Sequence, residues 1–368
     1  MTKMQVKRVK RKYYKKNRKD LLKKQKKFRD RWGPKARRPG GVTREKRKKR
    51  ATMDICGVIE RVAGLRYSAD EFPLPMRKLG NWGPLMPILG LGGQSVFELG
   101  TMKESEKVFD AAYEAGVRYI DTAHDYGESQ ERLGKLIAGI DDLFIATKIG
   151  QRDYDGFMRE LDENIERLGR NPDMVQIHAI NPHEEKTILQ NGGTLEVANE
   201  AKLDDGFSYL GLTSHAAPQT MTNIVKFGDG IDSALVAISA ADTRFLDAFI
   251  PEAREKGVAI IGMKVFGRMR LVQPGGPGVT TAEEALRFVW SCPVDVAIVG
   301  FSFPAEVKDC ARIAEDFVPM DLPTMRDLVD GTALYSEDVM FYRDGLEKWD
   351  DVPGLRPSMN WYYGMVTE

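Results

Sequence analysis

The feature that most constrains the fold is an eightfold alternation of strand-like and helix-like segments between residues 86 and 315. The strand-like segments are short, continuous apolar runs, which are typical of strands buried on both faces of a parallel sheet. Strands are expected at 86–91, 117–121, 143–148, 173–178, 207–212, 233–238, 258–264 and 295–300. The helices that follow them are expected at 103–115, 129–138, 154–168, 195–203, 217–227, 245–256, 281–290 and 304–315. Eight units over about 240 residues match a (β/α)8 TIM barrel in number and size.

A doubly wound open sheet is the main alternative to the barrel. Such sheets bind dinucleotides through a GxGxxG turn between the first strand and the first helix. Residues 90–93 (GLGG) lack that spacing, and no immediate helix is expected after them. The sequence therefore favours the barrel, preceded by a short strand at 78–80 and a tight turn at 81–83.

The N-terminal segment differs sharply in charge from the rest of the chain. Residues 1–50 contain 25 Lys and Arg and three acidic residues, whereas the remainder contains 30 and 51, so the net charge of +1 hides two opposite parts. A disordered extension is expected at 1–52, because it has few large aliphatic side chains to bury, followed by a connector at 53–76. It is interpreted either as an electrostatic arm for nucleic acid, or as a solvated tail or a segment upstream of a start at Met53.

Several classes of protein are disfavoured by composition. No uninterrupted apolar segment reaches the roughly 18 residues of a membrane span, and no apolar region follows the basic residues as in a secretory signal. The three cysteines, Cys56, Cys292 and Cys310, are widely spaced and form no CxxC pair. Neither a disulfide framework nor a zinc site is indicated, so a reducing, cytoplasmic location is predicted.

The barrel is expected to span 77–320, with an aromatic-rich C-terminal tail at 321–368. Two interpretations of this tail stay open, because aromatic side chains bury well in either place. It packs on the outside of the barrel, or it forms a wall over the barrel mouth.

Polar side chains occur where neighbouring predicted strands end. Asp121 ends the second strand and Tyr126 follows in its loop, while Lys148, His178 and Lys264 end the third, fourth and seventh strands. A barrel interior is filled with apolar layers, so charged residues at strand ends belong at the rim where active sites form. An acid, a phenol, an amine and an imidazole are therefore expected in one small space.

This set of groups suits protonation of an oxyanion as it forms. A phenol with a pKa near 10 is a poor proton donor at neutral pH, and a buried ammonium beside it is expected to lower that pKa. A carboxylate would hold the ammonium in place, and an imidazole would orient a carbonyl oxygen. With no nucleophile–base pair or metal cluster, the indicated reaction is reduction of C=O by hydride from a cofactor.

At this point the sequence resembles an aldo-keto reductase over about residues 77 to 316. The resemblance is carried by residues 79–80, 87–92, 119–123, 126–129, 133–134, 145–148 and 176–178. It implies that Tyr126 is the proton donor, Lys148 its pKa partner, Asp121 the partner of the lysine and His178 the group that orients the carbonyl. It also implies a (β/α)8 barrel that binds NADP, or alternatively NAD, without a Rossmann fold.

The resemblance further implies where the cofactor would bind. The implied contacts are Gly92, Gly93, Asp121, Thr213, Ser214, Met263, Lys264, Phe266, Gly267, Gly300, Ser302 and Glu306.

The sequence departs from the family pattern at several of the implied cofactor positions. Ser214 replaces an Asn, Leu235 a carboxamide-binding Gln, and Met263 an aromatic residue. Ser302 and Glu306 stand where NADP-preferring members often carry a basic residue, so a cation for a 2′-phosphate would come from Arg268 or Arg270.

The function implied is therefore an NAD(P)-dependent oxidoreductase that reduces a small-molecule aldehyde or ketone. The departures on the cofactor side, together with the basic extension, motivate an alternative from another class. In that alternative the chain is a catalytically weak nucleotide-binding barrel that acts as a regulatory or scaffold subunit.

Overall fold

The computed structural model describes residues 73–81, 83–99, 101–203, 206–272, 280–333 and 335–340. The predictions for the basic extension, for the connector up to residue 72 and for the aromatic residues beyond 340 lie outside this part of the chain. The proposed nucleic-acid arm and the domain boundaries stay predictions.

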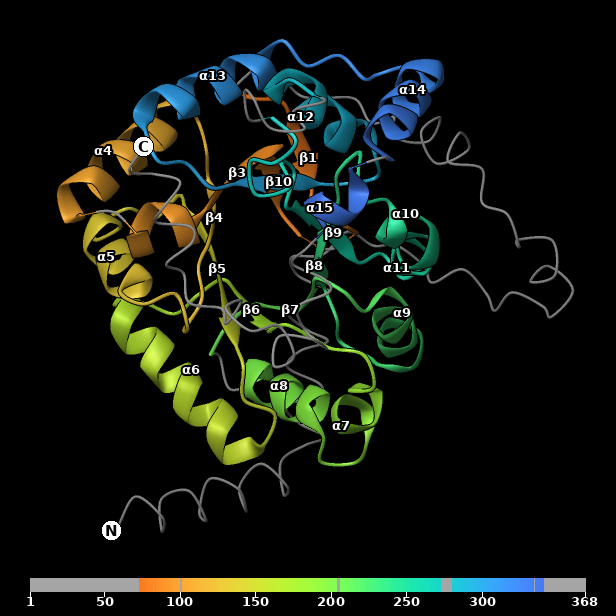
Figure 1. The fold of residues 1–368 in the computed structure, drawn as a ribbon. Coiled ribbons are helices and arrows are strands. Elements are labelled where there is room, and N and C mark those ends of the chain that lie inside the picture. The colour runs from red at the N-terminus through yellow and green to blue at the C-terminus, as the bar shows by residue number, and fades with distance from the viewer. Residues whose placement is uncertain are drawn as a thin grey trace, which may run out of the picture.

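Eight parallel strands close into a ring surrounded by helices, which confirms the predicted (β/α)8 barrel (Figure 1). The barrel closes because the last strand, β10, pairs with the first, β3. The strands are β3 (Leu89–Gly92), β4 (Tyr119–Asp121), β5 (Phe144–Ile149), β6 (Met174–Ile177), β7 (Tyr209–Ser214), β8 (Ser233–Ala237), β9 (Ala259–Met263) and β10 (Val296–Val299). The outer helices are α4 (Met102–Glu114), α5 (Ser129–Leu136), α6 (Tyr154–Leu168), α7 (Glu185–Leu189), α8 (Thr194–Leu203), α9 (Pro218–Phe227), α10 (Arg244–Ala248), α11 (Ile250–Glu255), α12 (Ala282–Ser291) and α13 (Pro304–Glu315).

Alternation along the strands separates the barrel interior from the layer under the helices. The interior cluster contains Tyr119, Phe144 and Met174, with the rings of Tyr119 and Phe144 stacked 5.4 Å apart. Because side chains two residues apart share a face, Asp121 and Gln176 follow Tyr119 and Met174 into the interior. The interior is thus apolar toward the strand N-termini and polar toward their C-termini.

A short antiparallel hairpin lies at the N-terminal end of the barrel. It consists of β1 (Met76–Lys78) and β2 (Leu85–Pro87), and Leu79 from its turn joins the interior apolar cluster. Arg77 donates to the main-chain oxygens of Val294 at 2.5 Å and of Trp290 at 2.6 Å. The hairpin is therefore tied to the last turn of α12 and to the segment that joins α12 to β10, and it packs against the base of the barrel.

Three local expectations were wrong. The strand expected at 86–91 is two elements, because the chain passes from the hairpin to the barrel at Ile88, whose amide donates to Pro75 and whose carbonyl accepts from Ala297. The helix expected at 245–256 is divided into α10 and α11 at Phe249, two residues before Pro251, because proline is favoured in the first turn of a helix and disfavours a helix that continues through it. A π-helix, η1 (Gln94–Leu99), directly follows Gly93 where no helix was expected.

The C-terminal tail packs on the barrel in two different places. Helix α14 (Leu322–Ala333) contributes Leu322, Leu328 and Val329 to the main core under the outer helices. Helix α15 (Ser336–Val339) packs its buried Val339 against Ala241 and Leu271, in the loops that follow β8 and β9. The described part of the tail therefore packs on the barrel, and the choice between the two interpretations of the whole tail stays a prediction.

None of the helices in the described part of the chain combines the length and apolar character that a membrane crossing requires. Cys292 and Cys310 are buried free thiols, and Cys56 lies outside the described residues. The cytoplasmic location stays a prediction.

Candidate functional site

The four residues predicted for catalysis come together at the C-terminal rim of the barrel. Asp121 is the last residue of β4, Lys148 lies near the end of β5, and His178 directly follows β6. Tyr126 lies in the loop between β4 and α5. Parallel strands bring their C-terminal ends to one rim, so residues distant in sequence become neighbours here.

Lys148 is the centre of the cluster. Its side chain is only 2% exposed, and its ammonium lies 2.5 Å from Asp121 Oδ2 and donates to the Thr122 carbonyl at 2.8 Å. The same Nζ atom lies 4.7 Å from the centre of the Tyr126 ring, and its positive charge lowers the pKa of that phenol. One ammonium therefore links the buried carboxylate to the phenol, as expected.

His178 lies against the other side of the phenol. Its ring meets the Tyr126 ring edge-on, with centroids 6.2 Å apart and an angle of 78°. Its Nδ1 atom lies 3.5 Å from Asp125 Oδ1, and its main-chain oxygen accepts from Arg152 Nη2 at 2.7 Å. Arg152 in turn pairs with Glu184, so the His178 backbone is held from the loop after β5.

The protonation states differ in part from expectation. Burial raises the pKa of Tyr126 to about 12, although the Lys148 ammonium pulls it down; Asp121 and Asp125 also raise it. The Lys148 ammonium thus lowers the phenol pKa as expected, but burial of the phenol outweighs that effect. Burial lowers the pKa of His178 to about 4 against the opposing effect of Asp125, so its imidazole is neutral at pH 7.

Burial and neighbouring charges also compete in setting the pKa values of Asp121 and Lys148. Burial raises the pKa of the Asp121 carboxyl above its ordinary value, while Lys148 and Gln176 pull it down. Burial lowers the pKa of Lys148, but Asp121 and Tyr126 raise it by more, so the ammonium stays charged at neutral pH.

Gln176 is a site residue that sequence reasoning missed. It is fully buried in β6, and its Nε2 donates to Asp121 Oδ1 at 3.1 Å. This is the carboxylate oxygen that does not bond to Lys148, which contacts Oδ2. Gly211 on the next strand makes room for it, because a Cβ there would lie 2.8 Å from the Gln176 Cγ. A polar residue two positions before His178 in an apolar strand was the signal that could have found it.

The predicted cofactor glycines are sites of close backbone approach. A Cβ on Gly93 would lie 2.5 Å from the Asp121 carbonyl, and one on Gly300 would lie 2.5 Å from Ser95 Oγ. A Cβ on Gly92 would lie 3.3 Å from the Gly300 amide. These glycines bring β3, β4 and β10 together at the rim.

Thr213 and Ser214, at the end of β7, already bond to the protein. Thr213 Oγ1 accepts from the Ala179 amide at 2.7 Å. Ser214 is fully buried, donates to the Ile180 carbonyl at 2.7 Å and accepts from the Ala217 amide at 3.1 Å. Leu235, in the position expected for a carboxamide-binding Gln, is buried in the apolar interior cluster.

The loop after β9 carries the remaining cations of the rim. Met263 ends the strand and is largely buried, and Phe266 packs against the main core. Lys264 and Arg268 have φ of 61° and 54°, a left-handed conformation that side chains rarely adopt. A Cβ on Gly267 would lie 2.4 Å from Val339 Cγ1, so this glycine lets α15 pack on the loop.

The segment after β10 places a carboxylate at the N-terminus of α13. Glu306 Oε2 accepts from the amides of Ser302 at 2.6 Å and of Phe303 at 3.1 Å. A helix N-terminus attracts anions through such amides, and here the chain's own glutamate uses two of them.

A sequence model of the Aldo/keto reductase family matches residues 89–273, half of the chain. The chain belongs to this family. Its barrel aligns with the holo form of an aldo-keto reductase from Bacillus halodurans with a TM-score of 0.61 and 20% identity, over 70% of this chain and 96% of that one. At that identity the alignment shows the shared fold.

Two curated aldo-keto reductases illustrate the similarity in sequence. Str7 from Strobilurus tenacellus is 29% identical over 226 residues, covering 53% of this chain and 62% of that protein. A protein from Mycolicibacterium paratuberculosis is 41% identical over 101 residues, covering 26% of this chain and 34% of that one. The chain thus spans less than two thirds of the length of either relative.

As a member of this family, the chain is expected to hold a nicotinamide dinucleotide, and the cations of the rim fit that group. Burial lowers the pKa of Lys264 well below its ordinary value, and Arg268 and Lys148 lower it further. Burial likewise lowers the pKa of His215, helped by Lys264, His178 and Arg268. Half-buried basic side chains gathered in one place favour the binding of an anion such as a diphosphate.

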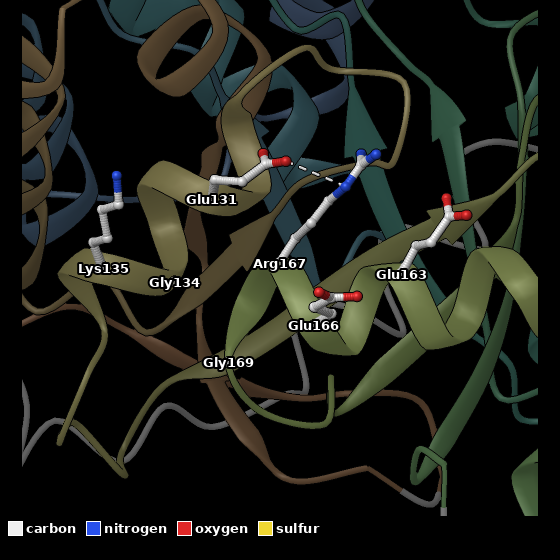
Figure 2. A pocket seen from close by; sticks show the side chains of 7 residues that line it. All are labelled: Glu131, Gly134, Lys135, Glu163, Glu166, Arg167 and Gly169. Carbon is white, nitrogen blue, oxygen red and sulfur yellow. Dashed lines mark ion pairs between the residues drawn. The ribbon is translucent and has the colours of Figure 1, made fainter.

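Two further observations on the described residues concern metal ligands and a surface hollow. In this part of the chain, no group of three or more His, Cys, Asp or Glu side chains is arranged to hold a metal ion. A hollow of about 560 Å³ opens between α5 and α6 (Figure 2). Charged residues dominate its lining, which consists of Glu131, Gly134, Lys135, Glu163, Glu166, Arg167 and Gly169.

Proposed function

We propose that the chain is an NAD(P)-dependent oxidoreductase that reduces a small-molecule aldehyde or ketone by hydride transfer. The observation that carries this proposal is the buried Lys148 ammonium, which links the Asp121 carboxylate to the Tyr126 phenol at the barrel mouth. His178 lies against the same phenol ring and completes the set.

Tyr126 is the proton donor of the proposed reaction. With a pKa of about 12 the phenol is protonated at neutral pH, so the proton is present when charge develops on the substrate oxygen. Lys148 stabilises the phenolate that remains, and this interaction is stronger in the transition state than before it. Asp121 keeps the ammonium in place and balances its charge.

His178 orients the substrate carbonyl. With a pKa of about 4 its imidazole is neutral at pH 7, and a neutral imidazole carries one N–H that can donate to a carbonyl oxygen. Its edge-on contact with Tyr126 places the imidazole beside the phenol. A carbonyl oxygen between them would meet a hydrogen-bond donor and a proton donor together.

A bound nicotinamide dinucleotide supplies the hydride for this reaction. Lys264 and Arg268 are the residues proposed to hold its diphosphate. Ser214 is proposed to line the cofactor site without bonding to the cofactor through its hydroxyl. That hydroxyl already bonds to Ile180 and Ala217.

Glu306 is proposed to disfavour the 2′-phosphate of NADP and so to favour NAD. This proposal rests on the resemblance of residues 299–304 to the segment that binds the adenosine phosphate in the family. The Glu306 carboxylate accepts from the Ser302 and Phe303 amides, where a phosphate would compete with it. A Glu306→Gln variant is expected to bind NADPH more tightly relative to NADH, as measured by fluorescence titration of both cofactors.

The proposed function is tested by replacing the phenol alone. Tyr126→Phe is expected to lower kcat for carbonyl reduction by roughly 10²- to 10⁴-fold while cofactor affinity is retained. Tyr113→Phe is the matched control, because the Tyr113 hydroxyl bonds to Asp142 at the opposite end of strands β4 and β5. Turnover like that of the unmodified protein in Tyr126→Phe would contradict the assignment.

A regulatory or scaffold barrel is the second candidate. It is favoured by Ser214, whose hydroxyl is engaged by the protein, and by Leu235, which is apolar and buried. Tight cofactor binding with no turnover over a broad panel of aldehydes and ketones would support this candidate over the enzyme.

A further inference from the structure

Helix α6 carries a stripe of polar residues on the face that covers the barrel. We call Glu160, Glu163, Asn164 and Arg167 the α6 polar stripe; their spacing places them on one side of the helix. Glu160 is 6% exposed and Asn164 is fully buried, although this side of a barrel helix normally packs apolar residues. Buried polar groups require partners, so the partners indicate what the stripe holds.

Two members of the stripe bind the segment that follows Lys148. Glu160 accepts from the Gly150 amide at 2.9 Å and from the Gln151 amide at 3.2 Å. Asn164 donates from Nδ2 to the main-chain oxygen of Lys148 itself at 3.2 Å. The stripe therefore fixes the backbone that carries the ammonium.

The stripe also binds the loop that carries Tyr126, through His124. Glu163 Oε2 lies 2.8 Å from His124 Nε2, and Glu160 Oε1 lies 3.6 Å from His124 Nδ1. Arg167 donates from Nη1 to the His124 main-chain oxygen at 3.1 Å. Both the ring and the backbone of His124 are thus held by α6.

The same stripe reaches α5, which continues the loop. Asn164 Oδ1 accepts from Gln130 Nε2 at 2.7 Å, and Arg167 lies 3.2 Å from Glu131. Figure 2 shows the Glu131–Arg167 pair crossing the hollow between the two helices, with Glu163 farther along α6. The loop is therefore held by α6 both at His124 and at the start of α5.

Neighbouring residues of the loop between β4 and α5 make their contacts in opposite directions. His124 bonds outward to α6, whereas Asp125 lies near His178 and the Tyr126 ring lies 4.7 Å from the Lys148 ammonium. A shift of His124 away from α6 would therefore move Tyr126 relative to Lys148. A displacement of 1 Å at such a site can cost about 100-fold in rate.

We propose that the α6 polar stripe, acting through His124, positions the Tyr126 hydroxyl against the Lys148 ammonium. His124 and the stripe are positioning residues, because they touch neither of the two reacting groups. Their effect on the rate rests on the proposed carbonyl reduction, whereas their effect on the loop does not.

The kinetic test compares His124→Leu, His124→Gln and Glu163→Gln with Glu166→Gln in the full chain. Glu166 lies on the same helix, lines the same hollow and is exposed, so its variant is the matched control. His124→Leu is expected to lower kcat by roughly 10- to 100-fold with little change in cofactor affinity. His124→Gln is expected to restore most of the rate, since its amide can donate where Nε2 does, and Glu166→Gln to leave the rate unchanged.

The background of Tyr126→Phe separates positioning from general damage. With the phenol removed, His124→Leu is expected to cause no further loss of the residual rate. An equal loss in both backgrounds would overturn the proposal, because His124 would then act on something other than Tyr126.

A measurement independent of turnover keeps the two proposals distinguishable. Amide hydrogen exchange of residues 123–129 is expected to accelerate in His124→Leu and Glu163→Gln and to stay unchanged in Glu166→Gln. If the unmodified chain reduces no carbonyl, the proposed function fails while the exchange result still decides whether the stripe holds the loop. Unchanged exchange in both stripe variants would overturn the positioning role.

Discussion

At the N-terminal end of the barrel, Asp295 accepts from the amides of Gly80 at 3.1 Å and Ile260 at 2.9 Å. Its second oxygen receives Arg254 Nη2 at 2.6 Å, and Arg254 Nη1 completes a bidentate pair. At the C-terminal end, Asp121 is just as buried but depends on two side chains, those of Lys148 and Gln176. The first carboxylate is held largely by backbone amides and a planar guanidinium, which cannot take part in proton transfer.

The backbone shows the same contrast. Within the described residues, five side-chain-bearing residues have positive φ, and all lie in the loops after β6 and β9 at the C-terminal rim. They are Ala179, His183, Lys264, Arg268 and Met269. Such conformations cost of order 1–3 kcal/mol each and tend to cluster at functional sites. The N-terminal end thus provides stability, and the C-terminal rim retains less stable groups that can react.

The largest expected effect is a loss of kcat that follows a substitution at the C-terminal rim but not one at the N-terminal end. Lys148→Met is expected to lower kcat by on the order of 10³-fold and to destabilise the fold by about 3 kcal/mol, because Asp121 loses its cation. Arg254→Met also removes a carboxylate's partner but is expected to leave kcat unchanged, since Asp295 lies at the other end. Kinetics and urea denaturation of both variants check this; equal losses of kcat would remove the distinction.

Lowering the pH should destabilise the folded chain through His178 at the C-terminal rim. Its pKa is about 4 in the folded chain and about 6.5 in an unfolded one, so the unfolded state binds the proton first as pH falls. This contribution is present above pH 6.5 and is lost between pH 6.5 and 4, by up to about 3 kcal/mol. Thermal unfolding from pH 7 to 4 should show less acid destabilisation in His178→Gln than in His183→Asn, a control at an exposed histidine. Identical pH profiles would contradict this.

Two glycines, one at each end of the barrel, allow the effects of an added methyl group at the rim and at the base to be compared. Gly93→Ala places a Cβ 2.5 Å from the Asp121 carbonyl, and Gly80→Ala places one 2.5 Å from the Gly257 carbonyl. Each is expected to destabilise the fold by about 1–3 kcal/mol through overpacking, and Gly80→Ala also strains a backbone with φ of 53°. Only Gly93→Ala should lower kcat, because it displaces Asp121; a similar loss in Gly80→Ala would show that the ends are coupled.

The smallest expected effect concerns Gln176. Gln176→Leu removes a hydrogen bond to the charged form of Asp121 that is worth about 1.5 kcal/mol. Because Gln176 lowers the Asp121 pKa, its loss should raise that pKa and move the acid limb of the kcat/KM profile to higher pH. An acid limb that stays in place would show that Lys148 alone controls the carboxylate.

Much of the fold could be predicted because each unit of the barrel is encoded locally. Asp153 begins α6 by accepting from the Gly156 amide, and Gly169 ends it with φ of 68°. Apolar runs such as β5 specify a strand buried on both faces. The error at Ile88 occurred where two elements meet, since the partner strand there is chosen by tertiary packing.

The sequence by itself determined the eightfold alternation, and with it the rim that would receive Asp121, Tyr126, Lys148 and His178, because strand periodicity and chain order are local properties. Only the tertiary structure decided how those groups are tuned. Burial brings the Tyr126 pKa to about 12, since desolvation depends on every neighbour around the phenol. Closure of the ring sets Gln176 beside Asp121, 55 positions away in the chain, and the packing of α6 brings its polar stripe to the loop that carries Tyr126.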